Sequence, residues 1–474
     1  MRHKQAIRCA TNGYQLLKRV GERIPKQCPT LTRLTHKLDV LAAAVWSVGL
    51  LAILSTIYAF SPVAASGDSR WSLHTAMSLI RGHAGDLTEY MPALERNDFY
   101  AIEYVDGRPH TSFPIGVSIL AIPAVAIGSL VRPAFFQELQ NSVPDRFEEI
   151  VASITGATAS VVFFWVLYSQ FGSLWTALAG TGILALGTSM WSTATRALVQ
   201  HGPLVLMFAI VMLLMVQAFR RPSLVQYAGL VLAMGYIVRP TAAVAIVVIS
   251  IYVLVFYRAW FLRYLGWAMV AAIPWMIFNY SIYGDILPPY YSASRMGSPS
   301  FLALLGILFS PSRGLLVFTP VMVFALSGFV LSLREQQRRP LHIAFAAIVV
   351  GITYIIVAWP GWWGGHCFGP RLMTDVVPFL VYFVAFNFHM PAEISQWART
   401  CLSASIAIFA IVGVLIHAQG ALRYGPWEWN YIPHNIDNRY RVWDWKDPQF
   451  LRTRAQPCRV DPGSCTPSPS QIRT

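Results

Sequence analysis

Charged residues are scarce in this chain. Asp, Glu, Lys and Arg make up 12% of its 474 residues, whereas soluble domains carry about 25%. Hydrophobic residues account for 55%, and the mean hydropathy is +0.50. Apolar runs close to the ~20 residues that cross a bilayer recur from residue 40 to residue 417. The composition excludes a soluble enzyme and a disordered chain, and it indicates an all-α polytopic membrane protein.

Lysine is rarer still, since the 36 basic residues include only 5 Lys, four of them in the first 40 residues. The formal net charge is +14. The basic residues gather in short stretches beside apolar runs, which is the pattern of the positive-inside rule. No soluble basic domain offers a surface to a duplex. We therefore expect membrane lipids and phosphates as partners, and no nucleic acid.

Metal-binding and nucleophile motifs are missing as well. The sequence has no His-Glu-x-x-His, Cys-x-x-Cys or Gly-x-Ser-x-Gly, and its six cysteines lack metal-ligand spacing. Cys458 and Cys465 enclose a Pro-Gly turn. They would form a small disulfide loop in an oxidising compartment, or would remain two free thiols. The apolar stretch after residue 40 is too long for a signal peptide.

Eleven apolar stretches are expected to span the membrane. Nine Lys or Arg in the first 39 residues place the N-terminus in the cytoplasm. The basic connectors 219–221, 257–263 and 334–339 favour the same side. The expected spans are 40–63, 150–169, 174–190, 204–219, 226–238, 242–257, 265–280, 315–333, 342–359, 376–388 and 401–417.

A twelfth apolar stretch, 115–131, cannot cross without moving all three later basic connectors to the outside. We expect it to lie at the outer surface or to re-enter there. The chain then has a basic cytoplasmic segment (1–39), a transmembrane domain (40–420) with a large external loop carrying interfacial helices (64–149), and an external tail (421–474). The tail is rich in Trp, and we expect these rings at the bilayer interface or capping the external loop.

Acids are absent from residues 150–284, whereas eleven of the 22 lie between Asp68 and Glu149. An ion-coupled transporter normally keeps an ionisable residue near the midplane of its spans, so this distribution argues against one. Polar clusters instead stand at helix ends that the topology places on the outer side. They are 66–70, 195–201, 239–240, 279–285, 310–313 and 366–375.

Such clusters suit a transferase that uses a sugar carried on a polyprenyl phosphate. Arginines would hold the phosphate, and a carboxylate at the first helix end would accept the proton of the incoming hydroxyl. Asp68 stands just beyond the first span. It is therefore the candidate general base, although an Asp before a helical stretch is also a common N-cap.

Seven stretches carry a resemblance to a known family, namely ASGDSRWSLHTAMSLIRGH, DGRPHTSFPIGVSILAIP, RALVQHGP, VRPTA, NYSIYGDILPPYY, FSPSRGLLVFTP and WWGGHCFGPRLMTDVVP. In these stretches the sequence resembles the GT-C superfamily of integral-membrane glycosyltransferases, which includes protein mannosyltransferases and aminoarabinose transferases. The resemblance covers residues 40–388. It implies a GT-C-like bundle, inverting transfer to a glycan, lipid or protein acceptor at the outer face, and a catalytic role for Asp68.

Two departures from the superfamily bear on chemistry. Many relatives have an acid in the second external loop, where this chain has residues 196–201 and no carboxylate. A divalent metal is therefore possible but not favoured, and no metal ligands are assigned. The loop-one motif 111–116 lacks the acid that aminoarabinose transferases carry beside their proline pair, so that substrate is not supported.

The remaining candidates divide by role. Arg239, Arg371, Arg196 and His201 are predicted to bind the donor phosphate, and Glu103, Asp106 and His366 are predicted to bind substrate. Some have simpler interpretations. Glu103 and Asp106 suit a polar turn, His201 suits a helix-end cap, and Arg371 would pair with Asp375 one turn further on.

The sequence thus predicts a glycosyltransferase of the bacterial inner membrane, with its active site on the outer, periplasmic side. The alternatives are a transporter or flippase of lipid or solute, and a non-catalytic scaffold of an envelope glycan machine. The sugar and the acceptor are not specified by the sequence.

Overall fold

The computed structural model describes residues 29–64, 67–96 and 101–452. It divides into two units, Met1–Leu50 and Leu51–Thr474, and the boundary falls within helix α2 (Pro29–Ala59). Most of the basic N-terminal segment lies outside the described residues. So do Cys458 and Cys465, whose pairing therefore stays open.

The prediction of an all-α polytopic membrane protein is confirmed. In the described part of the chain, seven helices are long and apolar enough to cross a membrane. The other four expected spans coincide with shorter apolar helices of 10–17 residues, which are Leu174–Leu186, Pro222–Val238, Pro240–Phe256 and Pro320–Ser332. The seven are Val40–Ala59, Asp145–Phe171, His201–Ala218, Arg258–Tyr283, Arg339–Ala358, Arg371–His389 and Gln396–Leu422.

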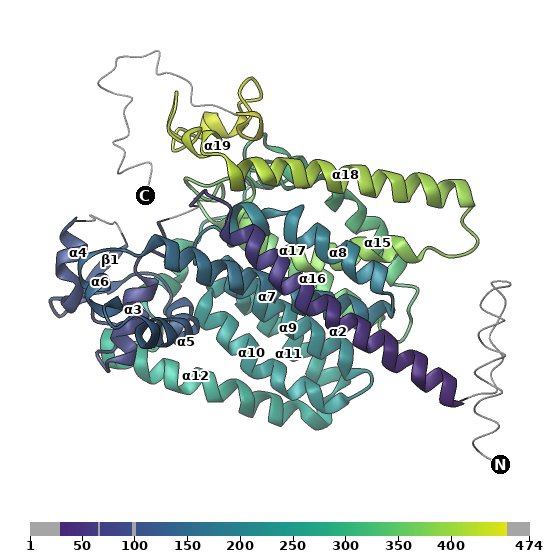
Figure 1. Cartoon of the computed structure of the whole chain (residues 1–474), viewed down its shortest axis with the longest axis horizontal. Coiled ribbons are helices and arrows are strands. Elements are labelled where there is room, and N and C mark those ends of the chain that lie inside the picture. The colour runs from purple at the N-terminus through teal and green to yellow at the C-terminus, as the bar shows by residue number, and fades with distance from the viewer. Residues whose placement is uncertain (1–28, 65–66, 97–100, 453–474) are drawn as a thin grey trace. The chain divides into compact units, whose positions relative to one another are not determined.

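Within the second unit the helices form one bundle. Figure 1 shows α12 and α18 along opposite edges, with α7, α9, α16 and α17 between them. Small residues let neighbours approach closely, as in other membrane bundles. A Cβ on Gly229 of α10 would lie 2.1 Å from the Tyr264 carbonyl oxygen of α12. The helices are α7 (Asp145–Phe171), α8 (Leu174–Leu186), α9 (His201–Ala218), α10 (Val225–Val238), α11 (Ala243–Phe256), α12 (Phe261–Tyr283), α13 (Phe301–Phe309), α14 (Leu315–Phe318), α15 (Phe324–Ser332), α16 (Arg339–Ala358), α17 (Val377–Phe386), α18 (Gln396–Leu422) and α19 (Gly425–Glu428).

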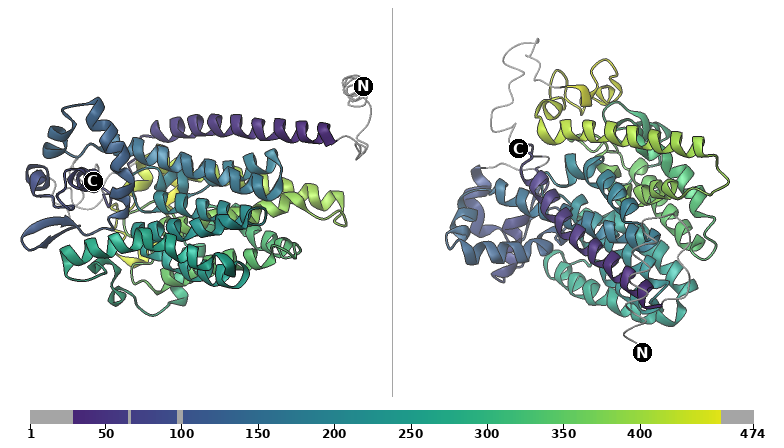
Figure 2. Two further views of the ribbon diagram at one scale, coloured as in Figure 1. Left: turned by 90° about the horizontal axis from the view of Figure 1, so that it is seen from below. Right: turned by 45° about the vertical axis from the view of Figure 1, so that its right-hand side comes forward.

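The large loop between α2 and α7 is folded (Figure 2). It contains α3 (Ser72–Ile80), α4 (Met91–Arg96), α5 (Gly116–Val131), α6 (Phe135–Asn141) and a hairpin of β1 (Ile102–Val105) and β2 (Arg108–Thr111). The antiparallel register pairs Ile102 with Thr111 and Val105 with Arg108. Helix α5 is the twelfth apolar stretch, and the chain bends by 115° between α5 and α6. This geometry suits a broken or re-entrant segment, and its placement outside the membrane stays a prediction.

The loop between α2 and α7 contains a buried histidine that makes its stability depend on pH. His74 of α3 is fully buried, and its Nε2 lies 3.1 Å from the Ser142 carbonyl oxygen. Burial lowers the pKa of His74 from 6.5 to about 4, although backbone contacts oppose the shift. Between pH 4 and pH 6.5, His74 therefore binds a proton in the unfolded chain and stays neutral in the folded loop. The contribution of neutral His74 to the free energy of unfolding is present above pH 6.5. It is lost progressively as the pH drops towards 4, by about 2 kcal/mol at pH 5.

We expect His74→Gln to reduce the difference in thermal unfolding temperature between pH 7.5 and pH 5. The matched control is His83→Gln, because the His83 side chain is 43% exposed. An equal pH dependence in the His74 variant and the wild type would contradict the assignment.

Two of the basic connectors contact each other at the end of the bundle opposite the loop between α2 and α7. The Arg338 guanidinium lies 5.1 Å from the centre of the Phe219 ring and donates to the Gln170 amide oxygen at 2.6 Å. Gln170 donates in turn to Glu335 at 2.9 Å. The connectors after α9 and after α15 therefore meet, as a topology that places both on one side of the membrane requires.

We expected the tail tryptophans to cap the loop between α2 and α7 or to lie at the bilayer interface. Trp429 does not cap that loop. Trp429 is buried with Ile436 and Val442, and this core packs against Trp362 and Trp363 of the segment after α16. Trp429 does not lie at a bilayer interface either, because it has no exposed surface. The ring packs inside a folded tail that covers a different loop.

Candidate functional site

A cavity of about 560 Å³ opens where the helix ends of the second unit meet. Four of the polar clusters that the sequence singled out contribute residues to its lining, namely 66–70, 195–201, 239–240 and 366–375. Its polar lining comes from the turn after α2, the start of α9, the α10–α11 break, the segment after α12 and the segment between α16 and α17. The residues concerned are Asp68, Ser69, Ser72, Gln200, His201, Arg239, Thr241, Tyr290, Tyr291, Ser292, Arg295 and Arg371.

Asp68 and Arg371 form an ion pair at this cavity. Arg371 Nη1 donates to Asp68 Oδ2 at 2.8 Å, although the two residues are 303 positions apart. Both side chains are largely but not fully enclosed, with 21% of Asp68 and 14% of Arg371 exposed. The candidate base and a candidate phosphate ligand therefore stand side by side.

A second carboxylate, Asp375, lies behind the cavity wall with no exposed surface. Arg239 Nε donates to Asp375 Oδ2 at 2.7 Å, and Thr241 Oγ1 donates to the same oxygen at 3.0 Å. His201 Nδ1 lies 2.7 Å from Asp375 Oδ1. One carboxylate thus fixes two predicted phosphate ligands, His201 and Arg239, at the cavity.

This arrangement replaces the pairing of Arg371 with Asp375 that the sequence suggested. Residues Arg371–Val376 form a 3₁₀ turn and not an α-helix. At three residues per turn, positions i and i+3 align, whereas i and i+4 diverge. Arg371 therefore turns towards Asp68, while Asp375 contacts His201 of α9 and Arg239 at the end of α10.

Arg295 is a lining residue that the sequence analysis did not select. Its Nη1 donates to the Tyr290 carbonyl at 3.3 Å, and its guanidinium lies 4.5 Å from the centre of the Tyr290 ring. Among the described residues, no carboxylate forms a salt bridge with it. Asp68 is the one acid in the described lining, against three arginines, and Asp375 behind the wall pairs with Arg239. The arginines therefore exceed the acids by one, so the cavity attracts anions. The sequence offered one indication of this position, because Arg295 follows the 279–285 cluster by ten residues.

Glu148 ties the Asp68 turn to the segment before α9, and the sequence analysis missed this role too. Ser69 donates its hydroxyl to Glu148 Oε1, and the Leu198 backbone N–H donates to the same oxygen at 2.8 Å. The Glu148 side chain is buried at the start of α7. The residue next to Asp68 is therefore anchored to the chain three residues before His201.

Arg196 is not at the cavity. It is fully buried and donates to the carbonyls of Ser61 at 2.6 Å and Thr195 at 2.7 Å, and to that of Tyr58. Burial lowers the pKa of Arg196 to about 10. The guanidinium satisfies carbonyls at the C-terminal end of α2, as basic residues often do at helix ends. The structure gives it this capping position in place of the predicted contact with donor phosphate.

The three predicted substrate-binding residues are also absent from the described cavity lining. Glu103 of β1 accepts a hydrogen bond from the Tyr283 hydroxyl at 2.8 Å, and burial raises the pKa of Glu103. Asp106 occupies the hairpin turn with φ of +49°, which fits its turn interpretation. The His366 ring stacks on Tyr431 with centres 4.6 Å apart, and burial lowers the pKa of His366.

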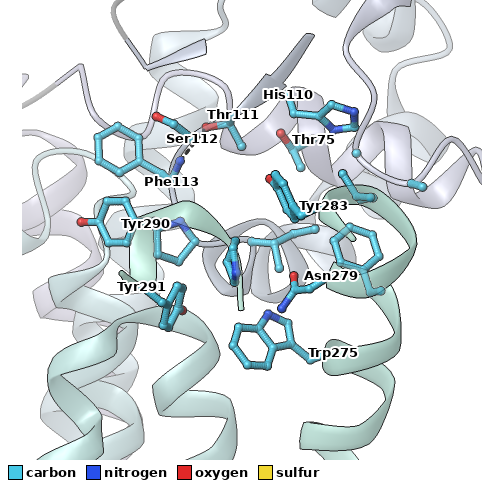
Figure 3. Close-up of a pocket in the computed structure, with 17 residues that line it drawn as sticks. Thr75, His110, Thr111, Ser112, Phe113, Trp275, Asn279, Tyr283, Tyr290 and Tyr291 are labelled. Atoms are coloured by element: carbon cyan, nitrogen blue, oxygen red, sulfur yellow. Dashed lines mark hydrogen bonds between the residues drawn. The ribbon is translucent and has the colours of Figure 1, made fainter. Parts of the chain in front are cut away.

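A second, smaller hollow adjoins the cavity (Figure 3). Its volume of about 30 Å³ has room for one or two water molecules. Figure 3 shows Tyr290 and Tyr291 on one side and Tyr283 and Asn279 on the other. Four residues belong to the lining of both spaces, namely Phe113, Pro114, Tyr290 and Tyr291.

Comparisons with known proteins identify the fold. No family model and no curated protein matches the sequence. Among solved structures, the chain is similar to ArnT from Cupriavidus metallidurans, crystallised with undecaprenyl phosphate. The similarity has a TM-score of 0.51 at 12% sequence identity and covers 80% of this chain and 71% of ArnT. The chain therefore shares the fold of this ArnT structure, and a fold of this kind was what the resemblance in its sequence predicted.

Proposed function

We propose that the protein is a glycosyltransferase that moves a sugar from a polyprenyl-phosphate donor to an acceptor at the periplasmic face of the bacterial inner membrane. The observation that carries the proposal is the Asp68–Arg371 pair at a large, arginine-lined cavity in a GT-C-like fold. The undecaprenyl phosphate named with the ArnT structure supports a donor of the polyprenyl class.

The cavity offers each part of such a donor a suitable surface. The phosphate would lie among Arg371, Arg239 and Arg295, which supply charge-assisted hydrogen bonds. The prenyl chain would leave along the apolar wall, where Ala243, Ile355 and Ile356 line the same cavity.

The proposed reaction is a direct displacement. The acceptor oxygen bonds to the anomeric carbon as the bond from that carbon to the phosphate oxygen breaks, and the configuration inverts. The phosphate leaves with the bonding electrons, and Asp68 takes the proton of the acceptor hydroxyl. Arg371 contacts Asp68 and would also contact the phosphate, so it aligns the base with the leaving group.

A donor turnover assay tests this function. Purified protein in lipid vesicles would receive polyprenyl-phosphate sugars of several kinds together with envelope lipids and glycans as acceptors. The expected result is time-dependent release of polyprenyl phosphate with matching labelling of an acceptor. Stoichiometric translocation of an intact donor, with no release, would instead support the flippase alternative.

Arg371→Ala should slow transfer by about 10²- to 10³-fold, equivalent to ~3–4 kcal/mol, because one preorganised donor to the leaving phosphate is lost. The rate of polyprenyl phosphate release measures the effect. Arg132→Ala serves as the control, because the Arg132 side chain is 61% exposed on the loop between α2 and α7. Equal rates for both variants would remove Arg371 from the mechanism.

Transfer should survive chelation of divalent ions. Where many relatives carry an acid in the second external loop, this chain has Arg196 and His201, and Asp68 already has a cationic partner in Arg371. The measurement is release of polyprenyl phosphate with and without EDTA. Complete loss, restored by added Mg²⁺ or Mn²⁺, would show that a metal ion takes part.

A further inference from the structure

The loop 361–370 between α16 and α17 has a left-handed backbone, which favours glycine, at three positions. Gly364, Gly365 and Gly369 have φ of +75°, +65° and +62°. A Cβ on Gly369 would also lie 2.7 Å from the Phe318 ring. Gly364 and Gly365 line the cavity, and Arg371 follows directly. The loop has no helix or sheet to satisfy its backbone, so other groups must hold its shape.

Two buried side chains from outside the loop do this. Arg313 donates from Nε to the Trp363 carbonyl at 2.7 Å and from Nη2 to the Gly365 carbonyl at 2.9 Å. Gln449 donates to the Cys367 carbonyl at 2.8 Å and accepts from the Gly369 N–H at 3.1 Å. Arg313 Nη1 also donates to Gln449 Oε1 at 2.8 Å, which joins the two side chains.

Gln449 belongs to the tail, whose own side chains are linked to one another around Trp429. The Trp429 indole donates to the Asp447 carbonyl at 2.6 Å, and the Arg441 guanidinium lies 4.2 Å from the ring centre. Arg441 and Arg452 each pair with Asp447 at 2.7 Å. Gln449 therefore reaches the loop from an ordered segment with a core of its own.

We infer that tail residues 425–452 form a positioning element of the active site, which acts through Gln449 on the loop that carries Arg371. The path is short. Gln449 accepts from the Gly369 N–H, and the Gly369 carbonyl accepts from the Arg371 N–H at 2.9 Å. Removing the Gln449 amide would leave one carbonyl and one N–H of the loop without their buried partner. The inference rests on the proposed function, because it assumes that Arg371 binds the donor phosphate.

The test is a double-mutant cycle on the full-length protein in nanodiscs, with undecaprenyl phosphate as the probe. Gln449→Ala should weaken its binding about tenfold, and Arg371→Ala should weaken it at least as much. In the Arg371→Ala background, Gln449→Ala should cause no further loss, because its effect passes through Arg371. Tyr440→Ala is the control on the same segment, since the Tyr440 side chain is 88% exposed.

The outcomes separate the inference from the proposed function. If Gln449→Ala binds the probe like the wild type, or if the two losses add, the tail has only a structural role and the inference is wrong. If Arg371→Ala itself binds normally, the phosphate site of the proposed function fails. If Gln449→Ala does not fold, Gln449→Glu replaces it in the cycle. This variant keeps the acceptor for Arg313 and Gly369 but loses the donor to Cys367, and the same non-additivity is expected.

Discussion

Asp68→Asn should abolish sugar transfer in a protein that remains folded. The amide has the size of the carboxylate and still offers Arg371 an oxygen, but it cannot take the proton of the acceptor hydroxyl. General bases contribute about 10²- to 10⁴-fold, so we expect a loss of at least ~10³-fold in the rate of polyprenyl phosphate release. Undecaprenyl phosphate should still bind, because the arginines are intact.

Asp86→Asn is the matched control. Asp86 lies on the same loop and accepts from the Thr88 backbone N–H at 2.8 Å, outside the described cavity lining. It should lose little activity. If Asp68→Asn kept a tenth or more of the wild-type rate, Asp68 would be a turn or cap residue and the base would lie elsewhere.

The second large effect concerns stability. Asp375→Asn should destabilise the protein by about 3–5 kcal/mol, because it leaves the largely buried Arg239 guanidinium without its carboxylate partner. The Asp375 side chain has no exposed surface, and that of Arg239 is 13% exposed. Thermal unfolding of the detergent-solubilised protein measures the effect.

A compensating variant shows whether charge is the cause. Adding Arg239→Gln to Asp375→Asn should recover part of the lost stability, since the buried cation is removed as well. The double variant should still transfer sugar poorly, because it lacks one arginine of the phosphate site. An unfolding temperature for Asp375→Asn equal to that of the wild type would contradict the account of this cluster.

The bilayer spans were accessible from sequence because a span is a local property. About twenty apolar residues in a row identify a long helix such as α16 or α18 without knowledge of its neighbours. Four of the expected spans coincide with shorter apolar helices of 10–17 residues, and 3₁₀ turns such as Pro240–Ala242 interrupt the regular α-helix there. The positive-inside rule likewise predicted that the polar clusters lie at one end of the bundle. Four residues of these clusters, Asp68, His201, Arg239 and Arg371, line one cavity there.

Pairings within the site were not accessible. Helix-end clusters specify a side of the membrane but no distances, so the sequence could not show that Arg371 meets Asp68 or that Asp375 meets Arg239. Arg196 belongs to a polar helix-end cluster, as the arginines of the cavity lining do, yet it caps α2. Gln449 carries no charge and belongs to no motif, and only the fold brings it to the loop before Arg371.

The most direct test of the central claim is an electron cryo-microscopy structure of the wild-type protein in nanodiscs with undecaprenyl phosphate. The proposed function predicts phosphate density in the cavity, within hydrogen-bonding distance of Arg371 and of Arg239 or Arg295, with the prenyl chain leaving past Ile355 and Ile356. Phosphate density on the lipid-facing surface of the bundle, with the arginine-lined cavity filled only by water, would contradict it.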